Sequence, residues 1–396
     1  MTIHLILFYT LLFSVVFLSA TAVILFRNLL TFNRIHDGLV SPAGSARPKV
    51  SILVPARNEA GVIGRCISSC LKQSYHPVEI VVLDDQSEDE TPSILRQMTE
   101  NESRLRVLQG KGPAEGWLGK PRACQQLGEA ADGEVLIFID ADVWLETTAV
   151  TRIVNNLYRD NLDALTVWPQ QRLVGFWEKV VVPLVYFTLT TMLPADYVRR
   201  DPRWIPPVFR AYFKTAFAAA CGQCIAFRKD VYTAIGGHSA VKDRVVEDVE
   251  LAKTLKKQGF TIGMYRGNHQ VHCRMYTNHH EIRQGFRKNF LAGFGNNLGL
   301  FCAAALLHIV VFILPFAGFI IALMHGNEAL LLVSFTAIIL VHLQRLAVDL
   351  SNGWNPVYGL LHMLGVLWFQ RLGITVLSDY IMRRNVSWKG RNIQPK

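Results

Sequence analysis

Leu136-Ile-Phe-Ile-Asp140-Ala-Asp142-Val143 is an apolar run that ends in two carboxylates one residue apart. In an extended chain alternate side chains share one face, so both acids are expected to point toward one site at the carboxyl edge of a strand. Open α/β sheets bind their ligands at that edge. Carboxylate oxygens suit Mg²⁺ or Mn²⁺, and such an ion completes its shell with water and substrate phosphates. Taken alone, an Asp-x-Asp after a strand is more commonly a solvated turn, so the surrounding motifs decide its meaning.

Short apolar strands and helices alternate along the chain around this motif. The expected strands span residues 50–55, 78–83, 106–109 and 135–139, and the expected helices span residues 64–73, 91–100 and 121–131. This alternation predicts an α/β domain with a mostly parallel, doubly wound sheet. Beyond Asp142 the pattern is less regular, with further strands expected near residues 164–168 and 224–227.

The composition and the first segment indicate a membrane protein. Apolar residues make up 51% of the 396 residues and charged residues only 18%; such a balance is typical of chains with membrane segments. Residues 3–26 carry no charge, and a run of this length crosses a hydrocarbon core of about 30 Å. The run is longer than a signal-peptide core and lacks a basic start, which favours a retained anchor. Arg27 and Arg34 follow it, so the polar middle of the chain is expected on the cytoplasmic side of a bacterial inner or plasma membrane.

The C-terminal third contains three more apolar runs, at residues 298–324, 329–348 and 358–377. If all three cross the membrane, the basic tail 381–396 lies outside, which contradicts the positive-inside rule. One weaker run is therefore expected to be re-entrant or interfacial, or else the aromatic segment 175–194 counts as an additional piece in the headgroup plane. The number of spans is left open.

The expected organisation has five parts. These are an anchor at 1–27, a linker at 28–47, a cytoplasmic α/β domain at 48–295, membrane helices at 296–380 and a basic tail at 381–396.

The net charge of +10 suits an anionic leaflet, and no recognition motif supports a nucleic-acid partner. Disulfides are not expected in a reducing compartment, and the Cys221-Gly-Gln-Cys224 motif precedes an expected strand, which disfavours a redox role.

Polar turns follow the first two expected strands. The first reads Val54-Pro55-Ala56-Arg57-Asn58-Glu59, and the second reads Leu83-Asp84-Asp85-Gln86-Ser87. Two such turns form a crevice of the kind that binds a nucleotide, where a carboxylate accepts hydrogen bonds from a uracil N–H or ribose hydroxyls. Alternatively, Asp85 or Ser87 caps the next helix. Neither turn contains a P-loop or a Gly-x-Gly-x-x-Gly, which argues against ATP hydrolysis and dinucleotide redox chemistry.

Two further motifs stand immediately before expected helices. Trp117-Leu-Gly119-Lys120-Pro-Arg122 supplies two cations that can pair with a diphosphate, although surface charges are the simpler alternative. Val245-Val-Glu247-Asp248-Val-Glu250 supplies acids that the helix dipole keeps ionised. An ionised acid can take a proton from an acceptor hydroxyl; N-capping is the alternative.

Taken together and in this order, the motifs resemble the nucleotide-sugar glycosyltransferases of family 2, which have a GT-A fold, over about residues 48–295. Within that family the chain is similar to membrane enzymes that glycosylate carotenoids of the diaponeurosporenoate type, and to hopanoid-associated relatives. The finer resemblance rests on Trp117-x-Gly119-Lys120 with Ala123-Cys124, Asp140-Ala-Asp-Val143, Gly236-Gly-His238, Arg274-Met-Tyr276, Gly285-x-x-Lys288 and Val386-x-Trp388-Lys-Gly-Arg391.

The resemblance implies how the donor is bound. Asp84 is similar to the acid that contacts the uracil and ribose of a UDP-sugar, and Pro55, Ala56 and Glu59 are similar to the first nucleotide-binding loop. Lys120 matches a basic position near the diphosphate.

The resemblance also implies the reaction. Asp140 and Asp142 are similar to a motif for Mg²⁺ or Mn²⁺, with Asp142 as the direct ligand. Asp248 is similar to the general base and Glu247 supports it. The implied mechanism is a direct displacement that inverts the anomeric carbon while the departing diphosphate is stabilised.

Acceptor-side residues are implied at His238 and in Gln284-Gly-Phe-Arg287-Lys288. In processive relatives the latter motif reads Gln-x-x-Arg-Trp and binds the end of a growing polymer. Lys288 replaces the Trp, which indicates a single sugar transfer. The apolar stretches 176–193 and 204–217 either form an access groove for a long hydrophobe or pack on the membrane or in the core.

The sequence thus predicts a membrane-bound inverting glycosyltransferase that transfers one hexose from a UDP-sugar to a lipophilic acceptor, with a carotenoid as the first expectation. A transferase for another lipid, such as a hopanoid or ceramide, or a polysaccharide synthase is the alternative within the same class. A non-catalytic membrane scaffold is the alternative of another class, and the presence of Asp84, Asp142 and Asp248 together speaks against it.

Overall fold

The structure, a computed structural model, describes residues 2–35, 47–100, 102–112, 114–384 and 386–393. They form two compact units. The sheet unit consists of Phe32–Arg172 and Ala195–Met275, and the helical unit consists of Met1–Thr31, Leu173–Pro194 and Tyr276–Lys396.

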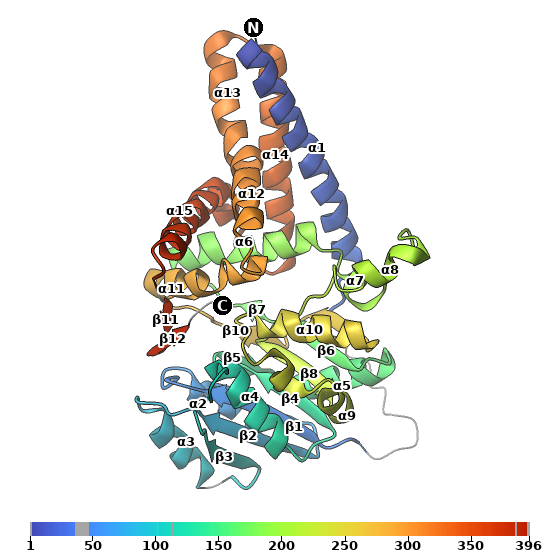
Figure 1. The fold of residues 1–396 in the computed structure, drawn as a ribbon, viewed down its shortest axis with the longest axis vertical. Helices are drawn as coiled ribbons and strands as arrows, with labels where there is room; N and C mark the ends of the chain where they lie inside the picture. The colour runs from blue at the N-terminus through green and yellow to red at the C-terminus, as the bar shows by residue number, and fades with distance from the viewer. Residues whose placement is uncertain (1, 36–46, 101, 113, 385, 394–396) are drawn as a thin grey trace. The chain divides into compact units, whose positions relative to one another are not determined.

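A seven-stranded sheet is the centre of the sheet unit, with strand order β3-β2-β1-β4-β8-β6-β9 (Figure 1). The strands are β1 (Val50–Ala56), β2 (Val78–Asp84), β3 (Leu105–Gln109), β4 (Val135–Ile139), β6 (Ala164–Trp168), β8 (Cys224–Arg228) and β9 (Ile262–Arg266). Only β8 runs antiparallel to its neighbours in this sheet. The predicted α/β class and mostly parallel sheet are confirmed.

A small second sheet and a set of helices complete this unit. The sheet has the order β5-β10-β7, formed by Val143–Leu145, Val271–Cys273 and Gln170–Gln171. The helices are α2 (Ile63–Leu71), α3 (Thr91–Thr99), α4 (Gly119–Ala130), α5 (Ala149–Arg159), α7 (Asp196–Arg199), α8 (Pro207–Phe213), α9 (Lys229–Ala234), the 3₁₀ helix η1 (Gly237–Val241) and α10 (Glu247–Gln258).

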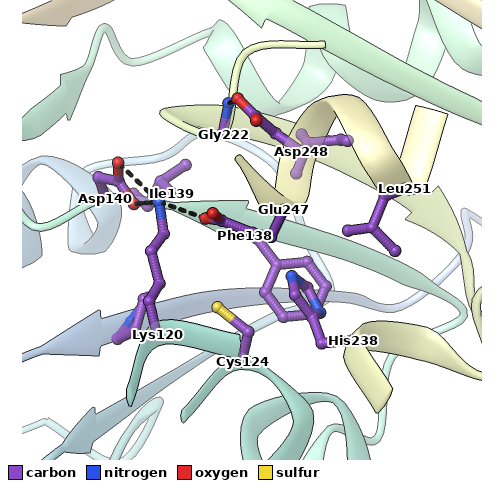
Figure 2. Close-up of a pocket in the computed structure, with 12 residues that line it drawn as sticks. Lys120, Cys124, Phe138, Ile139, Asp140, Gly222, His238, Glu247, Asp248 and Leu251 are labelled. Atoms are coloured by element: carbon purple, nitrogen blue, oxygen red, sulfur yellow. Dashed lines mark hydrogen bonds and ion pairs between the residues drawn. The ribbon is translucent and has the colours of Figure 1, made fainter. Parts of the chain in front are cut away.

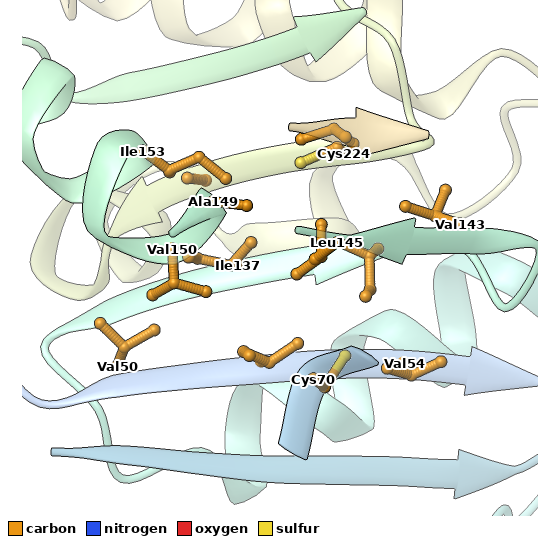
Figure 3. Close-up of a cluster of buried hydrophobic side chains, with 14 of the residues drawn as sticks. Val50, Val54, Cys70, Ile137, Val143, Leu145, Ala149, Val150, Ile153 and Cys224 are labelled. Atoms are coloured by element: carbon orange, nitrogen blue, oxygen red, sulfur yellow. The ribbon is translucent and has the colours of Figure 1, made fainter. Parts of the chain in front are cut away.

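The core explains why the central strands are apolar without interruption. All five residues of β4 are buried, because helices or the second sheet cover both faces of the main sheet. Helix α5 buries Val150, Ile153 and Leu157 at helical spacing, and Figure 3 shows Val150 and Ile153 in the same buried cluster as Ile137 of β4. Because the core covers both faces of the sheet, the strand ends are held in fixed positions.

Strand register brings the polar turns together. Ala56 of β1 pairs with Asp84 of β2, so the turns that follow these strands start at the same level. Ile139 of β4 pairs with Cys224 of β8, and the Asp140 N–H donates to the Gln223 carbonyl at 3.2 Å.

The helical unit contains four helical segments that are long and apolar enough to cross a membrane: His4–Thr31, Leu298–His325, Glu328–Ser351 and Pro356–Ile381. They comprise α1 (Thr2–Thr31), α12 (Leu298–His308), the π-helical turn η3 (Ile309–Ile313), α13 (Leu314–His325), α14 (Glu328–Ser351), the 3₁₀ helix η4 (Pro356–Leu361) and α15 (His362–Ile381). The unit also contains α6 (Phe176–Met192), α11 (His279–Asn289), the 3₁₀ helix η2 (Ala292–Phe294) and the hairpin β11 (Val386–Trp388) and β12 (Arg391–Ile393).

Within this unit α1, α13 and α14 lie side by side, whereas α6 runs across them (Figure 1). Thr21 of α1 donates to Gln344 of α14 at 3.0 Å. The Asn28 side chain of α1 donates to the Thr190 and Leu193 carbonyls at the end of α6, both at 2.7 Å. These hydrogen bonds therefore fix the position of α1 along α14 and against the end of α6, which apolar packing alone does not determine.

The compact units differ in three places from the domain boundaries expected from the sequence. Helix α1 continues to Thr31 rather than ending at 27. Residues 173–194 and 276–295 group with the helical unit rather than with the domain 48–295, because their apolar faces pack on other apolar helices. Residues 36–46 of the expected linker lie outside the described residues.

Candidate active site

The first turn of α10 presents an oriented carboxylate. Asp248 Oδ2 accepts the Gly222 N–H at 2.7 Å, and Asp248 Oδ1 accepts the Val249 N–H at 2.8 Å. Burial, together with the negative charge of Glu247, raises the pKa of Asp248 to about 6, and the positive charge of Lys120 opposes this shift. A carboxylate with such a pKa is ionised at neutral pH and still accepts a proton readily.

Lys120 connects three elements of the site. Its Nζ lies 2.8 and 3.1 Å from the two oxygens of Asp140, and 3.1 Å from Oε1 of Glu247 (Figure 2). Burial lowers the pKa of Lys120, but the two carboxylates outweigh this effect and hold it well above its ordinary value. A charged ammonium therefore joins α4, the end of β4 and the start of α10.

A pocket opens between these groups, with about 280 Å³ of empty space that includes its open mouth. Charged groups form one side, and the Asp248 carboxylate lies at the Gly222 backbone (Figure 2). The deeper wall is mostly apolar. The lining residues are Pro55, Lys120, Cys124, Phe138, Ile139, Asp140, Gly222, Ile225, His238, Glu247, Asp248 and Leu251.

The turns after β1 and β2 are joined by hydrogen bonds. The Asp84 carboxylate accepts the Ser87 N–H at 3.0 Å, Ser87 Oγ accepts the Asn58 N–H at 2.9 Å, and Asn58 Oδ1 accepts the Glu88 N–H at 2.8 Å. The predicted crevice edge is thus one connected polar rim, and Asp84 is a buried part of it at 2% exposure.

The first nucleotide-binding loop expected from the sequence lies on the same rim. Pro55 lines the pocket, Ala56 is buried, and the Glu59 N–H donates to Thr91 Oγ1 at 2.8 Å. The Thr91 N–H at the start of α3 donates a hydrogen bond to Asp89 Oδ1 at 3.0 Å. The capping role considered for Asp85 or Ser87 therefore falls to Asp89.

Asp140 and Asp142 are presented by a turn rather than by an extended strand. Strand β4 ends at Ile139, and the Val143 N–H donates back to the Asp140 carbonyl at 3.0 Å. Asp140 lines the pocket. Asp142 lies outside its lining, beside the thiol of Cys273, whose pKa is raised by burial and by the Asp142 charge.

These two acids suit a divalent cation by chemistry, because both offer hard oxygen donors. No group of three or more His, Cys, Asp or Glu residues capable of holding a metal occurs in the described part of the chain. A cation at Asp140 and Asp142 would therefore take its remaining ligands from water and from phosphate oxygens of a substrate.

The four residues implied on the acceptor side are divided between the two units. His238 lines the pocket of the sheet unit. Gln284, Arg287 and Lys288 lie on α11 of the helical unit. Arg287 Nε lies 2.6 Å from Asp379 Oδ2 of α15, so the structure gives this arginine an ion pair inside the helical unit.

Three residues at or beside the pocket were given no role from the sequence. Gly222 supplies the N–H that orients Asp248, and a Cβ at this position would lie 3.3 Å from both Asp248 Oδ2 and Lys120 Nζ. Cys124 lines the pocket, and the Tyr232 hydroxyl lies 2.8 Å from Nδ1 of His238, six residues further along the chain. The sequence signals for Gly222 and Cys124 were the Cys221–Cys224 motif, whose two cysteines are buried free thiols, and the Ala123-Cys124 pair.

Comparison with known proteins agrees with this geometry. Residues 51–232 match the family model described as glycosyl transferase family 2. A 4,4'-diaponeurosporenoate glycosyltransferase of Staphylococcus aureus strain MRSA252 is 26% identical over 373 residues, which cover 91% of this chain and 92% of that protein. The corresponding protein of strain USA300 is 25% identical with the same coverage.

Among solved structures, the mannosyltransferase PcManGT from Pyrobaculum calidifontis, in complex with GDP-Man and Mn²⁺, aligns with a TM-score of 0.54 at 17% identity. The alignment covers 96% of this chain and 99% of that one. The sheet topology and this structural likeness thus define an α/β protein with the GT-A fold. More particularly, the chain is a glycosyltransferase with a family 2 domain that resembles carotenoid glycosyltransferases.

Proposed function

We propose that this protein is a membrane-bound, inverting glycosyltransferase that transfers one hexose from a UDP-sugar to a carotenoid. The observation that carries the proposal is the position of Asp248, fixed by the Gly222 N–H in the same pocket as the Lys120, Asp140 and Glu247 cluster. The two relatives named as diaponeurosporenoate glycosyltransferases support a carotenoid acceptor.

The nucleotide binds along the rim formed by the turns after β1 and β2. Pro55, Ala56 and Glu59 form one side and Asp84 the other, where carboxylate and backbone groups meet the uracil and ribose. Register pairing of Ala56 with Asp84 supports this role, because it places both turns at the same sheet edge.

Lys120 binds the diphosphate, and Asp140 and Asp142 would hold a divalent cation beside it. The complex of PcManGT contains Mn²⁺, which supports a cation of this kind for the present chain. When bound, such a cation supplies positive charge that stabilises the leaving diphosphate. Lys120 Nζ adds a second positive charge and holds Asp140 in place until substrate arrives.

Asp248 acts as the general base. It takes the proton of the acceptor hydroxyl or carboxylic acid, and the acceptor oxygen attacks the anomeric carbon from the face opposite the diphosphate. The C–O bond to the acceptor forms as the bond to the diphosphate breaks, so the configuration inverts. Glu247 supports this step by raising the pKa of Asp248 and by holding Lys120.

A lipophilic acceptor is supported by the apolar surfaces of the chain. Four helical segments are long and apolar enough to cross a membrane. On the sheet unit, Trp204 and Phe209 are 68% and 54% exposed around α8, and Arg203 and Arg210 are exposed beside them. Exposed aromatic and basic side chains in one segment are typical of a surface that contacts anionic lipid headgroups.

The test is transfer by membranes that contain the protein, supplied with labelled UDP-glucose, Mn²⁺ and a carboxylated or hydroxylated carotenoid. We expect labelled glycosyl-carotenoid that disappears with EDTA and with Asp248→Asn. UDP release without this product would redirect the acceptor to another lipid. Absence of product and of UDP release with UDP-glucose, UDP-galactose and GDP-sugars would favour the non-catalytic scaffold.

A further inference from the structure

The proposed reaction assigns no step to His238 in the pocket, although the family resemblance implied a place for this residue on the acceptor side. His238 lies in η1, is only 3% exposed, and lines the pocket with its ring 5.0 Å from the Phe138 ring (Figure 2). Cys124 and Leu251 line the same part of the pocket. A buried imidazole in a largely apolar recess requires a defined hydrogen-bonding partner.

Tyr232 supplies one partner and fixes the ring proton. The Tyr232 hydroxyl oxygen accepts the backbone N–H of His238 at 3.3 Å and lies 2.8 Å from its Nδ1. Burial raises the pKa of Tyr232 well above its ordinary value, so the phenol keeps its proton. Within the described residues the hydroxyl has no other partner, so it donates to Nδ1, and the proton of the neutral ring is on Nε2.

The position of Tyr232 is itself tightly fixed. A Cβ on Gly128 would lie 2.6 Å from the Tyr232 ring, and one on Gly237 would lie 2.8 Å from it. Gly237 also has φ +55°, a conformation that favours glycine. Two close glycines therefore hold the phenol against the imidazole.

The imidazole stays uncharged at physiological pH. Burial and the nearby charge of Lys120 lower the pKa of His238 to about 3. Among the described residues none bonds to Nε2. The N–H at Nε2 is thus a neutral donor in a pocket whose lining combines apolar or weakly polar residues, among them Cys124, Phe138 and Leu251, with the charged cluster around Lys120.

We propose that His238 is a specificity-determining residue that donates a hydrogen bond from Nε2 to a hydroxyl of the transferred hexose. This inference rests on the proposed function. In the proposed reaction Lys120 binds the diphosphate and the anomeric carbon lies within reach of Asp248, so the hexose is the part of the donor that lies between these two residues, beside the wall that carries His238. A neutral donor on an apolar wall matches a sugar hydroxyl and its attached carbon better than a phosphate, which needs positive charge.

The test compares His238→Phe, which keeps an aromatic ring, with His238→Gln, which keeps an N–H donor. Binding of UDP and of UDP-glucose is measured by calorimetry, and kcat/KM is measured for UDP-glucose, UDP-galactose and UDP-xylose. In His238→Phe we expect unchanged UDP affinity, a fall of about ten- to a hundredfold in kcat/KM for UDP-glucose, and a weaker preference among the three sugars. His238→Gln is expected to recover part of the loss.

Tyr232→Phe tests the fixed ring proton separately. It should reduce kcat/KM less than His238→Phe does, and the double variant should be no worse than His238→Phe alone, because both changes act through one hydrogen bond. Each variant's melting temperature and its UDP affinity report on folding.

The outcomes separate this inference from the proposed function. If the wild-type protein transfers no sugar, the proposed function fails. If the wild type is active and His238→Phe binds UDP normally with unchanged sugar preference, only the role of His238 is overturned. Equal loss of UDP and UDP-glucose binding by folded His238→Phe also overturns it, since the residue would then act on the nucleotide.

Discussion

Asp248 is the residue whose loss should affect the rate most. Asp248→Asn keeps the shape and the acceptor for the Gly222 N–H but cannot take a proton, so kcat is expected to fall about 10²–10⁴-fold while UDP-sugar binding persists. Glu250→Gln is the matched control, because Glu250 lies in the same helical turn and pairs with Lys253 at 2.7 Å outside the pocket. Full turnover by Asp248→Asn would remove Asp248 from the role of base.

The pH dependence of the rate follows from the same carboxylate. Asp248 is active only when ionised, so kcat/KM should rise as the pH increases through about 6, the pKa to which burial and Glu247 bring it. Glu247→Gln removes a negative neighbour, which lowers the pKa of Asp248 and moves the rising limb to lower pH. If the rise of kcat/KM with pH occurs at the same pH in Glu247→Gln as in the wild type, the assignment of this rise to Asp248 is contradicted.

At the scale of elements, the turn before β8 places the base. Gly222→Ala would put a Cβ 3.3 Å from Asp248 Oδ2 and Lys120 Nζ, which displaces both by a few tenths of an ångström. We expect a kcat reduced by about tenfold or more with little change in melting temperature. Gly61→Ala is the control, since nothing lies within 4 Å of its added Cβ. Equal, near-wild-type rates in both variants would show that this turn does not position Asp248.

Helices α11 and α15 are joined by the Arg287–Asp379 ion pair, whose side chains are 27% and 7% exposed. Arg287→Gln and Asp379→Asn should each destabilise the helical unit by about 1–3 kcal/mol, and the double variant should be close to either single variant. Melting curves in detergent measure this. If Arg287→Gln instead abolishes transfer without a change in melting temperature while Asp379→Asn stays active, Arg287 contacts the acceptor, as the family resemblance implies.

Several elements could be predicted from the sequence because their burial determines which residue types they contain. Strands β1, β2 and β4 are buried on both faces, so their sequences are apolar without interruption, and the predicted limits differ from the observed ones by at most a residue. Helix α10 begins at Glu247, where the acidic first turn predicts a helix start.

Features that depend on tertiary contact could not be predicted in the same way. The turn at Asp140 forms through a local hydrogen bond from Val143, and Gly222 reaches Asp248 across 26 positions of sequence. Tyr232 and His238 are six residues apart, which is not a helical neighbour spacing, and a 3₁₀ turn that follows Gly236 in a left-handed conformation brings them together. Neither hydrophobic periodicity nor motif spacing reports such contacts.

At the scale of the whole molecule, the packing of α15 bears on the conflict between three C-terminal spans and the basic tail. Helix α15 packs on α6 and α11 rather than along α14, and Leu360, Leu367 and Ile374 on one side of the η4–α15 segment are 69%, 41% and 70% exposed. The exposed Arg371 and its neighbour Gln370 interrupt the apolar run of α15, and a charged side chain inside such a run disfavours a membrane crossing.

We therefore predict three membrane crossings, by α1, by α12–α13 and by α14. The basic tail then lies on the same side as the sheet unit, in agreement with the positive-inside rule, and the short connection at residues 326–327 on the opposite side contains no Lys or Arg. Reporter fusions should place the N-terminus outside and the C-terminus in the cytoplasm. A C-terminal reporter active only outside the cell would show that α15 crosses the membrane.

The central claim is that this pocket transfers a hexose to a carotenoid with Asp248 as the base. The most direct measurement is the formation of labelled glycosyl-carotenoid from UDP-[¹⁴C]glucose by membranes containing the wild-type protein, Asp248→Asn or Glu250→Gln. We predict product with the wild type and with Glu250→Gln, and a loss of about a hundredfold or more with Asp248→Asn. Equal product from all three proteins, or from membranes lacking the protein, would contradict the claim.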